Sequence, residues 1–150
     1  MKNNTGKLMG ICISDIKGIQ KSAVDSAVLV ENHGIAQDAH AGDWPRQVSL
    51  LSYEKIQEFN ARGAEVIDGA FGENLIVSGI DLAALPVGTH MRCGDTELEV
   101  TQIGKECHTH CQIYQKMGEC IMPRQGIFAR VLHGGTIHKG DEIQLISEDA

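Results

Sequence analysis

The chain has 150 residues, of which 42% are hydrophobic and 22% charged, and its formal net charge is −7. This length and composition predict one folded domain, residues 1–150, and are unlike those of a disordered chain. An acidic chain with no basic run lacks the cationic surface that nucleic acids require, so no nucleic-acid partner is expected. Seventeen glycines and 4% aromatic residues indicate many tight turns and a mainly β fold.

The N-terminal residues and the cysteines bear on where the protein works. Residues 1–7 are polar, and no 18-residue apolar run occurs in the sequence, so we expect a cytoplasmic protein that does not enter a membrane. In a reducing compartment a disulfide framework is not expected, and each cysteine is a buried filler, a metal ligand or a reactive thiol. Cys12 lies in an apolar segment, which favours the buried role, and Cys93 lies beside a predicted turn.

Short strand candidates follow one another along the chain, with few helices between them. The predicted strands cover residues 7–14, 26–31, 47–51, 73–77, 87–92, 96–103, 127–132 and 142–146. A helix is predicted over residues 53–61, because Ser52 can cap it, Gly63 can end it and its apolar residues recur every three positions. Residues 80–85 form a turn or short helical piece that stops at Pro86. Many short strands with brief helices predict a closed or strongly curved β architecture.

Two segments carry further structural expectations. Alternation in strand 96–103 places Leu98, Val100 and Gln102 on one face, and Glu97, Glu99 and Thr101 on the other. Residues 32–43 are predicted to be a polar loop, and residues 111–117 to form one or two helical turns.

The densest cluster of reactive side chains is Cys107-His108-Thr109-His110-Cys111, with Cys120 nine residues later. Thiolates and imidazoles on this scale can bind zinc or copper, but Cys-x₃-Cys is less specific than paired Cys-x₂-Cys motifs. Alternatively, Lys105, His108 and His110 could lower the pKa of the Cys107 thiol and make it reactive. A third interpretation is that Cys107 is a buried small hydrophobic residue.

A second candidate is the loop 37–47, which contains Asp38, His40, Trp44 and Arg46. Such residues in a loop with Gly and Pro are typical of ligand binding on a rigid scaffold. The structural alternative is that Asp38 caps backbone groups while Trp44 covers the core. Guanidinium groups bind phosphate or carboxylate bidentately, so Arg46, Arg124 and Arg130 are candidates for an anion pocket. Pairing with one of the twenty acidic residues is the alternative for each arginine.

Several segments resemble, in order, the MOSC family, which is named for the C-terminal domain of molybdenum-cofactor sulfurases. They are residues 38–42 (DAHAG), 46–51 (RQVSLL), 71–75 (FGENL), 85–88 (LPVG), 104–108 (GKECH) and 126–131 (GIFARV), followed by Gly135 and Gly140-Asp141. Each segment is weak alone, but the ordered set covers almost the whole chain. The resemblance to a small stand-alone member implies a mainly β fold. Such a fold is a distorted, mostly antiparallel β-barrel of the pyruvate-kinase β-barrel-like kind, with a few short helices.

The resemblance also implies a function. The family's characteristic cysteine aligns with Cys107, which would carry sulfur or ligate molybdenum, and Cys111 and Cys120 are candidate resolving thiols. Cofactor-binding candidates on segments that line the family's pocket are His40, Arg46, Asn74 and Arg130, with Arg124 added by its charge. The implied cofactor is the molybdenum cofactor (molybdopterin). The implied partners are a cysteine desulfurase and enzymes that make or accept that cofactor.

Two departures from the family pattern bear on the chemistry. Many relatives have Arg-x-Pro-Cys at the key thiol, whereas this chain has Gly104-Lys105-Glu106-Cys107, so a positive charge and a rigid proline are absent. The chain also lacks the length and fold of a pyridoxal-phosphate desulfurase domain. Pyridoxal phosphate is therefore not expected, and sulfur would come from another protein.

Three functions stay open at this point. The first is a molybdenum-cofactor accessory protein that binds a pterin phosphate and uses Cys107 as sulfur carrier or metal ligand. The second is a molybdenum-dependent reductase of N-hydroxylated substrates. The third is a non-enzymatic module that binds a metal or a partner through Cys107, His108, His110, Cys111 and Cys120. The sequence decides neither among these functions nor on the oligomeric state.

Overall fold

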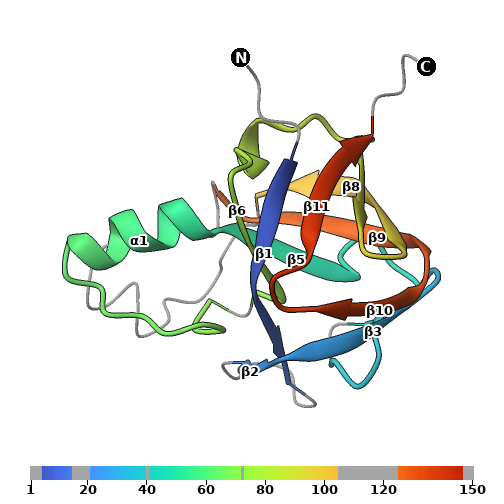
Figure 1. Cartoon of the computed structure of the whole chain (residues 1–150), viewed down its shortest axis with the longest axis horizontal. Helices are drawn as coiled ribbons and strands as arrows, with labels where there is room; N and C mark the ends of the chain where they lie inside the picture. The colour runs from blue at the N-terminus through green and yellow to red at the C-terminus, as the bar shows by residue number, and fades with distance from the viewer. Residues whose placement is uncertain (1–4, 15–20, 40, 72, 105–124, 147–150) are drawn as a thin grey trace.

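Short strands dominate the chain in the computed structural model, which describes residues 5–14, 21–39, 41–71, 73–104 and 125–146. Within these residues a closed β-barrel forms the body, and one α-helix projects away from it (Figure 1). The elements are β1 (Thr5–Ile13), β2 (Ser22–Val24), β3 (Ser26–Val30), β4 (Gly34–Ile35), β5 (Val48–Ser52), α1 (Tyr53–Ala61), β6 (Leu75–Ser78), the 3-10 helix η1 (Leu82–Ala84), β7 (His90–Cys93), β8 (Thr96–Ile103), β9 (Ile127–His133), β10 (Gly135–His138) and β11 (Glu142–Ile146).

Seven strands make the barrel in the order β11-β7-β8-β9-β5-β6-β1, and pairing of β1 with β11 closes it. Neighbouring barrel strands are antiparallel except β5 and β6, which are parallel. Parallel neighbours need a crossover connection, and the segment that contains α1 provides it. The predicted distorted, mostly antiparallel barrel with few helices is therefore confirmed.

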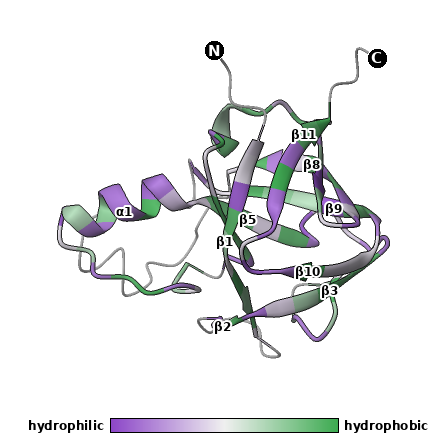
Figure 2. Cartoon of the chain, viewed as in Figure 1, coloured by the Kyte–Doolittle hydropathy of each residue, from purple (hydrophilic) through white to green (hydrophobic). Residues whose placement is uncertain are grey.

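Helix α1 begins and ends where its sequence predicts. The Ser52 side chain accepts a hydrogen bond from the Lys55 backbone N–H at 3.3 Å, which caps the N-terminus. Gly63, just beyond the C-terminus, has a φ of +102°, a backbone conformation that glycine adopts without strain. Ile56 and Phe59 are the buried residues of the helix, whose other positions are mostly hydrophilic (Figure 2).

The main core fills the inside of the barrel. Each barrel strand contributes fully or almost fully buried apolar side chains, among them Leu8, Leu50, Leu75, Leu98 and Ala129. A bulge in β1 between Leu8 and Gly10 shifts the alternation, which allows both Leu8 and Ile11 to join this core. The sheet β10-β3-β4 adds Leu29, Ile35 and Ile137 to the same cluster.

A second, smaller core lies on the outer face of the barrel, where α1 packs. Its buried members are Cys12, Leu51, Ile56, Ile76 and Phe128, from β1, β5, α1, β6 and β9. Phe128 alternates with the inward-facing Ile127 and Ala129 along β9. This outer core therefore fixes the position of the Phe128 ring.

Three short strands differ from the prediction. β4 lies within the predicted polar loop 32–43, β10 lies between the predicted strands 127–132 and 142–146, and β2 is a further strand of three residues. β4 and β10 both pair with β3, so distant partners rather than local periodicity make them strands. The predicted helical turns at 111–117 lie outside the described residues.

The predicted alternation in β8 is wrong beyond Val100. The register between β8 and β9 shifts between Val100 and Gln102, which leaves Thr101 as the extra residue of a bulge. Leu98 and Val100 are buried as predicted, but Gln102 pairs with Phe128 and is absent from the barrel core.

No helix in the described part of the chain is long and apolar enough to cross a membrane.

Asn74, immediately before β6, ties three strands together. Its side-chain oxygen accepts from the Ser49 backbone N–H at 2.9 Å, and its amide nitrogen donates to the Cys12 carbonyl at 3.0 Å. Its own backbone N–H donates to the Ser49 hydroxyl at 3.0 Å. Asn74 is fully buried, so water cannot replace these bonds if the side chain is removed.

We expect Asn74→Ala to lower the free energy of unfolding by about 2–4 kcal/mol, because buried groups of Ser49 and Cys12 lose their partner. Urea denaturation measures the effect, and Gln144→Ala, at an exposed position of β11, is the control. A loss below about 0.5 kcal/mol for Asn74→Ala would mean that these bonds do not hold the strands together.

Candidate anion-binding site

The sequence-predicted site residues divide into two groups. Arg46, Asn74 and Arg130 belong to the described part of the structure, whereas His40, Cys107, His108, His110, Cys111, Cys120 and Arg124 lie outside it. The segment 105–124 contains Cys107, Cys111 and Cys120, and the residues that flank it are described. The Gly104 backbone N–H donates to the Gly126 carbonyl at 2.6 Å, so the segment leaves and re-enters the barrel between β8 and β9.

The start of the loop 37–47 is anchored by a buried ion pair. Lys21 Nζ lies 2.7 Å from Asp38 Oδ1, and the two side chains are 1% and 0% exposed. The same oxygen accepts from the Ser14 backbone N–H, and the Ala39 N–H donates to the Ser14 carbonyl. Asp38 therefore binds backbone and Lys21, which agrees with the structural alternative for this residue.

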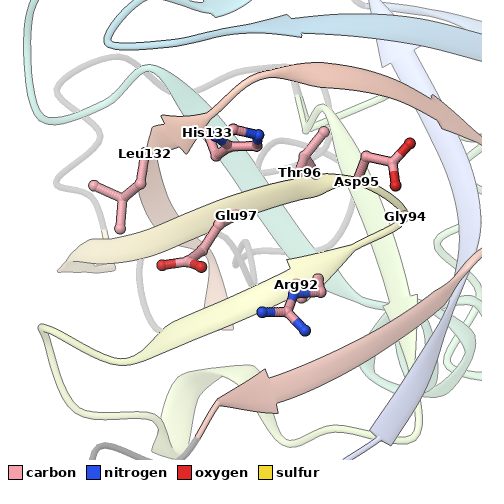
Figure 3. A pocket seen from close by; sticks show the side chains of 7 residues that line it. All are labelled: Arg92, Gly94, Asp95, Thr96, Glu97, Leu132 and His133. Atoms are coloured by element: carbon pink, nitrogen blue, oxygen red, sulfur yellow. The ribbon is translucent and has the colours of Figure 1, made fainter.

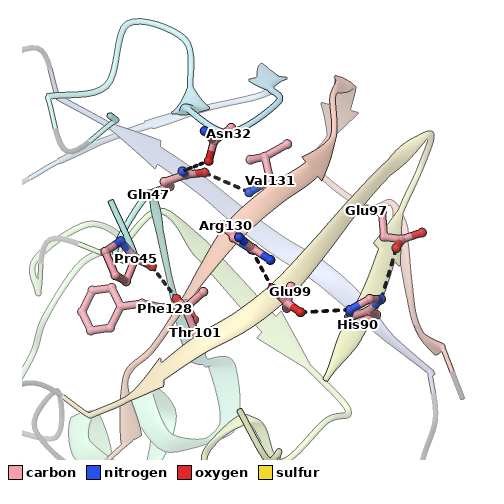
Figure 4. A network of polar contacts seen from close by, with 10 residues as sticks. All are labelled: Asn32, Pro45, Gln47, His90, Glu97, Glu99, Thr101, Phe128, Arg130 and Val131. Atoms are coloured by element: carbon pink, nitrogen blue, oxygen red, sulfur yellow. Dashed lines mark hydrogen bonds and ion pairs between the residues drawn. The ribbon is translucent and has the colours of Figure 1, made fainter. Parts of the chain in front are cut away.

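The far end of the loop is anchored by Gln47, which is 1% exposed. Its side-chain oxygen accepts from the Val131 backbone N–H at 3.0 Å, and its amide nitrogen donates to Asn32 Oδ1 at 3.1 Å (Figure 4). Asn32 in turn donates to Asp43 Oδ1 at 3.1 Å. The residues on either side of Trp44 and Arg46 are thus bonded to β9 and to the turn after β3.

Between these anchors, Arg46 is held against two aromatic rings. Its guanidinium carbon lies 4.7 Å from the centre of the Trp44 ring and 5.8 Å from that of Phe128. Such contacts use the flat face of the guanidinium, whereas its N–H donors lie in the plane. In the described part of the chain no carboxylate pairs with Arg46. The half-buried cation therefore keeps hydrogen-bond donors for a further acceptor, and an oxyanion matches them.

Arg130 has a different environment. Its Nε lies 2.6 Å from Glu99 Oε1, and Glu99 Oε2 lies 3.2 Å from His90 Nε2 (Figure 4). His90 Nδ1 is 3.3 Å from Glu97 Oε2, so the contacts form a chain across β7, β8 and β9. Partial burial alone would raise the pKa of Glu99, but hydrogen bonds and charge from His90 and Arg130 outweigh it and lower this pKa. Arg130 therefore has the carboxylate partner expected of a surface arginine.

The two arginines are related through β9. Phe128 and Arg130 are two residues apart on this strand, so their side chains lie on the same outer face. Arg46 stacks on Phe128, and Arg130 is 48% exposed beside it on the strand. The outer face of β9 thus carries both Arg130 and the Phe128 ring on which Arg46 stacks.

Two buried ionisable groups, Cys12 and Glu73, belong to or lie near the outer core that contains Phe128. Glu73 is 1% exposed and accepts hydrogen bonds from the Gly69 and Phe71 backbone N–H groups at 3.0 Å. Burial raises the pKa of Glu73. Burial, and then the charges of Glu73 and Asp68, raise the pKa of the Cys12 thiol to about 12. The predicted buried role of Cys12 is confirmed.

A shallow open depression of about 600 Å³ lies elsewhere, at the β7–β8 turn (Figure 3). It is lined by Arg92, Gly94, Asp95, Thr96, Glu97, Leu132 and His133. Its charged groups have both signs, and its buried polar residue, Thr96, donates its hydroxyl proton to the Cys93 carbonyl. The described residues contain no group of three His, Cys, Asp or Glu side chains that could hold a metal ion. The face with Arg46 is therefore the better candidate site.

Fold and site together define a β-barrel protein with an arginine-bearing loop at the junction of β5, β8 and β9. A model of the MOSC domain matches residues 37–144, and the chain belongs to the MOSC domain family. The matched segment includes the loop with Arg46 and both strands that frame residues 105–124. The sequence resemblance to this family is thereby confirmed.

Solved structures of the same fold are similar to this chain over most of its length. The YuaD protein from Bacillus subtilis superposes with a TM-score of 0.78 at 23% identity, covering 94% of this chain and 95% of YuaD. YiiM from Geobacillus stearothermophilus gives 0.71 at 19% identity, with 95% and 75% coverage. YiiM from Escherichia coli gives 0.62 at 20% identity, with 100% and 72% coverage. At these identities the similarity shows the fold, and no curated protein sequence matches the chain.

Sequence reasoning did not identify several residues that build the site. Lys21, the partner of Asp38, is 17 positions away from it in a segment without a motif. The sequence predicts that Gln47 begins a buried strand, but nothing nearby in the sequence indicates its bonds to Asn32 and Val131. The sequence predicts that the apolar residue Phe128 lies on a strand, but its contact with Arg46 depends on the pairing of β5 with β9.

We expect Cys12 and Cys93 to stay unmodified when the native protein is treated with iodoacetamide at pH 8. Burial, with Asp141 adding to it, raises the pKa of Cys93 to about 12, as at Cys12, so about one thiol in ten thousand is ionised. Peptide mass spectrometry measures the labelling at each position, with unfolded protein as the fully labelled control. Rapid labelling of Cys12 in the native protein would contradict the buried, protonated state.

Proposed function

We propose that this MOSC protein binds the phosphate of a molybdenum-cofactor pterin beside Cys107. The observation that carries the proposal is Arg46: a half-buried guanidinium, fixed on Trp44 and Phe128, without a carboxylate partner among the described residues. A phosphate group offers the oxygen acceptors that such a guanidinium binds bidentately. A local cationic site of this kind is compatible with a chain whose net charge is −7.

The other arginines would complete the anion site. Arg130 donates to Glu99 through Nε, so its remaining N–H groups are the donors it would offer. Arg124 and His40 lie outside the described residues, and we propose them as further ligands from their positions in the sequence. Asn74 would act indirectly, because its amide is engaged with Ser49 and Cys12 and supports β5, the strand that follows Arg46.

Cys107 would supply the reactive group. It follows Gly104 by three residues, a length of chain that spans at most about 11 Å, and Gly104 follows Thr101, the contact of Pro45, by three more. The thiol of Cys107 would thus be tethered near the Arg46 loop. When bound, the cofactor would supply a molybdenum ion that a soft thiolate can ligate.

As a sulfur carrier, Cys107 would accept sulfur from the persulfide of a cysteine desulfurase. The Cys107 thiolate would attack the outer sulfur, a new S–S bond would form, and the desulfurase thiolate would leave as the old S–S bond breaks. The attacking thiolate supplies the electron pair of the new bond, and the leaving thiolate keeps the pair of the old bond. No external oxidant or reductant is therefore needed. The thiolate of Cys111 or Cys120 would then be able to attack the Cys107 sulfur, so that a disulfide forms as the persulfide bond breaks and the outer sulfur leaves as hydrosulfide.

The proposal predicts that incubation with a cysteine desulfurase and cysteine adds one sulfur atom, about 32 Da, to Cys107 in the anaerobically purified protein. Mass spectrometry locates the added mass, and pterin and elemental analysis measure bound cofactor. Cys107→Ser should gain no sulfur at this position, whereas Cys93→Ala, at a buried thiol, should behave as the wild type does. The proposal would be refuted if Cys107 gained no sulfur and the protein contained no bound pterin and no molybdenum.

The same measurements separate the other two functions. Molybdenum at about one ion per chain, with no sulfur on Cys107, would favour the reductase. Zinc at one ion per chain, with unfolding on chelation, would favour the Cys/His metal-binding module.

A further inference from the structure

We infer that Thr101 is a positioning residue for Arg46: its hydroxyl in the β8 bulge holds the Pro45 carbonyl and thereby fixes the guanidinium at the anion site. The inference rests on the proposed anion-binding role of Arg46. Thr101 is separated from Pro45 by 56 residues in sequence, and no motif or resemblance marks it as part of the site.

The contact starts from a constraint at Pro45. Proline has no backbone N–H, so the carbonyl is the one backbone group through which Pro45 can be hydrogen-bonded. The Thr101 hydroxyl lies within hydrogen-bond distance of this carbonyl and, at 3.1 Å, of the Phe128 carbonyl (Figure 4). The hydroxyl has a single proton, which either oxygen can accept. Thr101 thus connects the loop residue just before Arg46 with the strand residue on which Arg46 stacks.

The bulge places Thr101 in this position. The register of β8 against β9 shifts between Val100 and Gln102, so Thr101 has no directly opposed partner on β9. A bulge redirects a side chain at the cost of one regular pairing, and bulges are common beside functional sites. Here the redirected hydroxyl contacts the loop 37–47, which connects to β5 on the far side of β9.

The three restraints on Arg46 act on different parts of the residue. Thr101 restrains the backbone before it, and Gln47, bonded to Val131, restrains the backbone after it. Trp44 and Phe128 restrain the guanidinium through its face. A guanidinium held in this way loses little conformational freedom when an anion binds, which favours affinity. Thr101 is partly exposed, so its hydroxyl can be removed without leaving a cavity in the core.

The test compares Thr101→Val, which keeps the shape but loses the hydroxyl, with Thr101→Ser, which keeps the hydroxyl. Thr101→Ala is a second variant without the hydroxyl. The chain offers a matched control in Thr89→Val, since the Thr89 hydroxyl donates to the Pro86 carbonyl at 2.7 Å without touching the loop 37–47. Two quantities are measured in the folded full-length chain. One is the order of the Arg46 Nε–H bond by ¹⁵N relaxation, and the other is the affinity for inorganic phosphate from the fluorescence of Trp44, the single tryptophan.

We expect Thr101→Val and Thr101→Ala to lower the order of the Arg46 Nε–H bond and to weaken phosphate binding about fivefold. Thr101→Ser and Thr89→Val should match the wild type in both quantities. Unchanged Arg46 order in Thr101→Val, or a Thr101→Ser variant as disordered as Thr101→Val, would overturn the inference. If Thr101→Val loosens Arg46 but the wild type binds phosphate no better than Arg46→Gln, Thr101 positions Arg46 and the proposed anion site fails.

Discussion

The pairing of β9 with β5 on one edge and β8 on the other is the constraint on which the site depends. Ala129 shows it directly, because this buried residue is the register partner of both Val48 and Val100. Its small side chain points into the barrel, so its neighbours Phe128 and Arg130 point outward. The outer face of β9 consequently meets the loop before β5 on one side and the β8 bulge on the other. A one-residue slip of β9 would turn Phe128 and Arg130 into the core and remove the site.

The polar and reactive side chains of the barrel have different roles. Buried polar side chains support the fold: Asn74 ties β1, β5 and β6, and the Lys21–Asp38 pair anchors the loop 37–47. Burial keeps Cys12 and Cys93 protonated, with the pKa of each at about 12. Arg46, by contrast, is fixed on Trp44 and Phe128 without a carboxylate partner among the described residues. For this reason we propose Arg46, rather than Cys12 or Cys93, as a functional group.

Local sequence patterns predicted the elements that a capping residue or a periodic pattern of apolar residues defines. Ser52, Ile56 and Phe59 define α1, and the alternation of Leu98 and Val100 defines the inner face of β8. The family resemblance predicted the barrel, and the cofactor-binding role that it implies for Arg46 stays a prediction. The pattern could not predict β4 or β10, because their pairing with β3 depends on distant residues. The role of Thr101 was equally hidden, since a bulge is a property of two paired strands rather than of one segment. Cys107 lies outside the described residues and stays a prediction.

We propose that Arg46 and Cys107 belong to one site for a molybdenum-cofactor pterin. A crystal structure of the protein after anaerobic incubation with the molybdenum cofactor tests this claim most directly. We expect the pterin phosphate to bind the guanidinium of Arg46, with the Cys107 sulfur adjacent to the same molecule. A cofactor bound away from Arg46, or one that lies on Arg46 with Cys107 remote from it, would show that the two residues do not form one site.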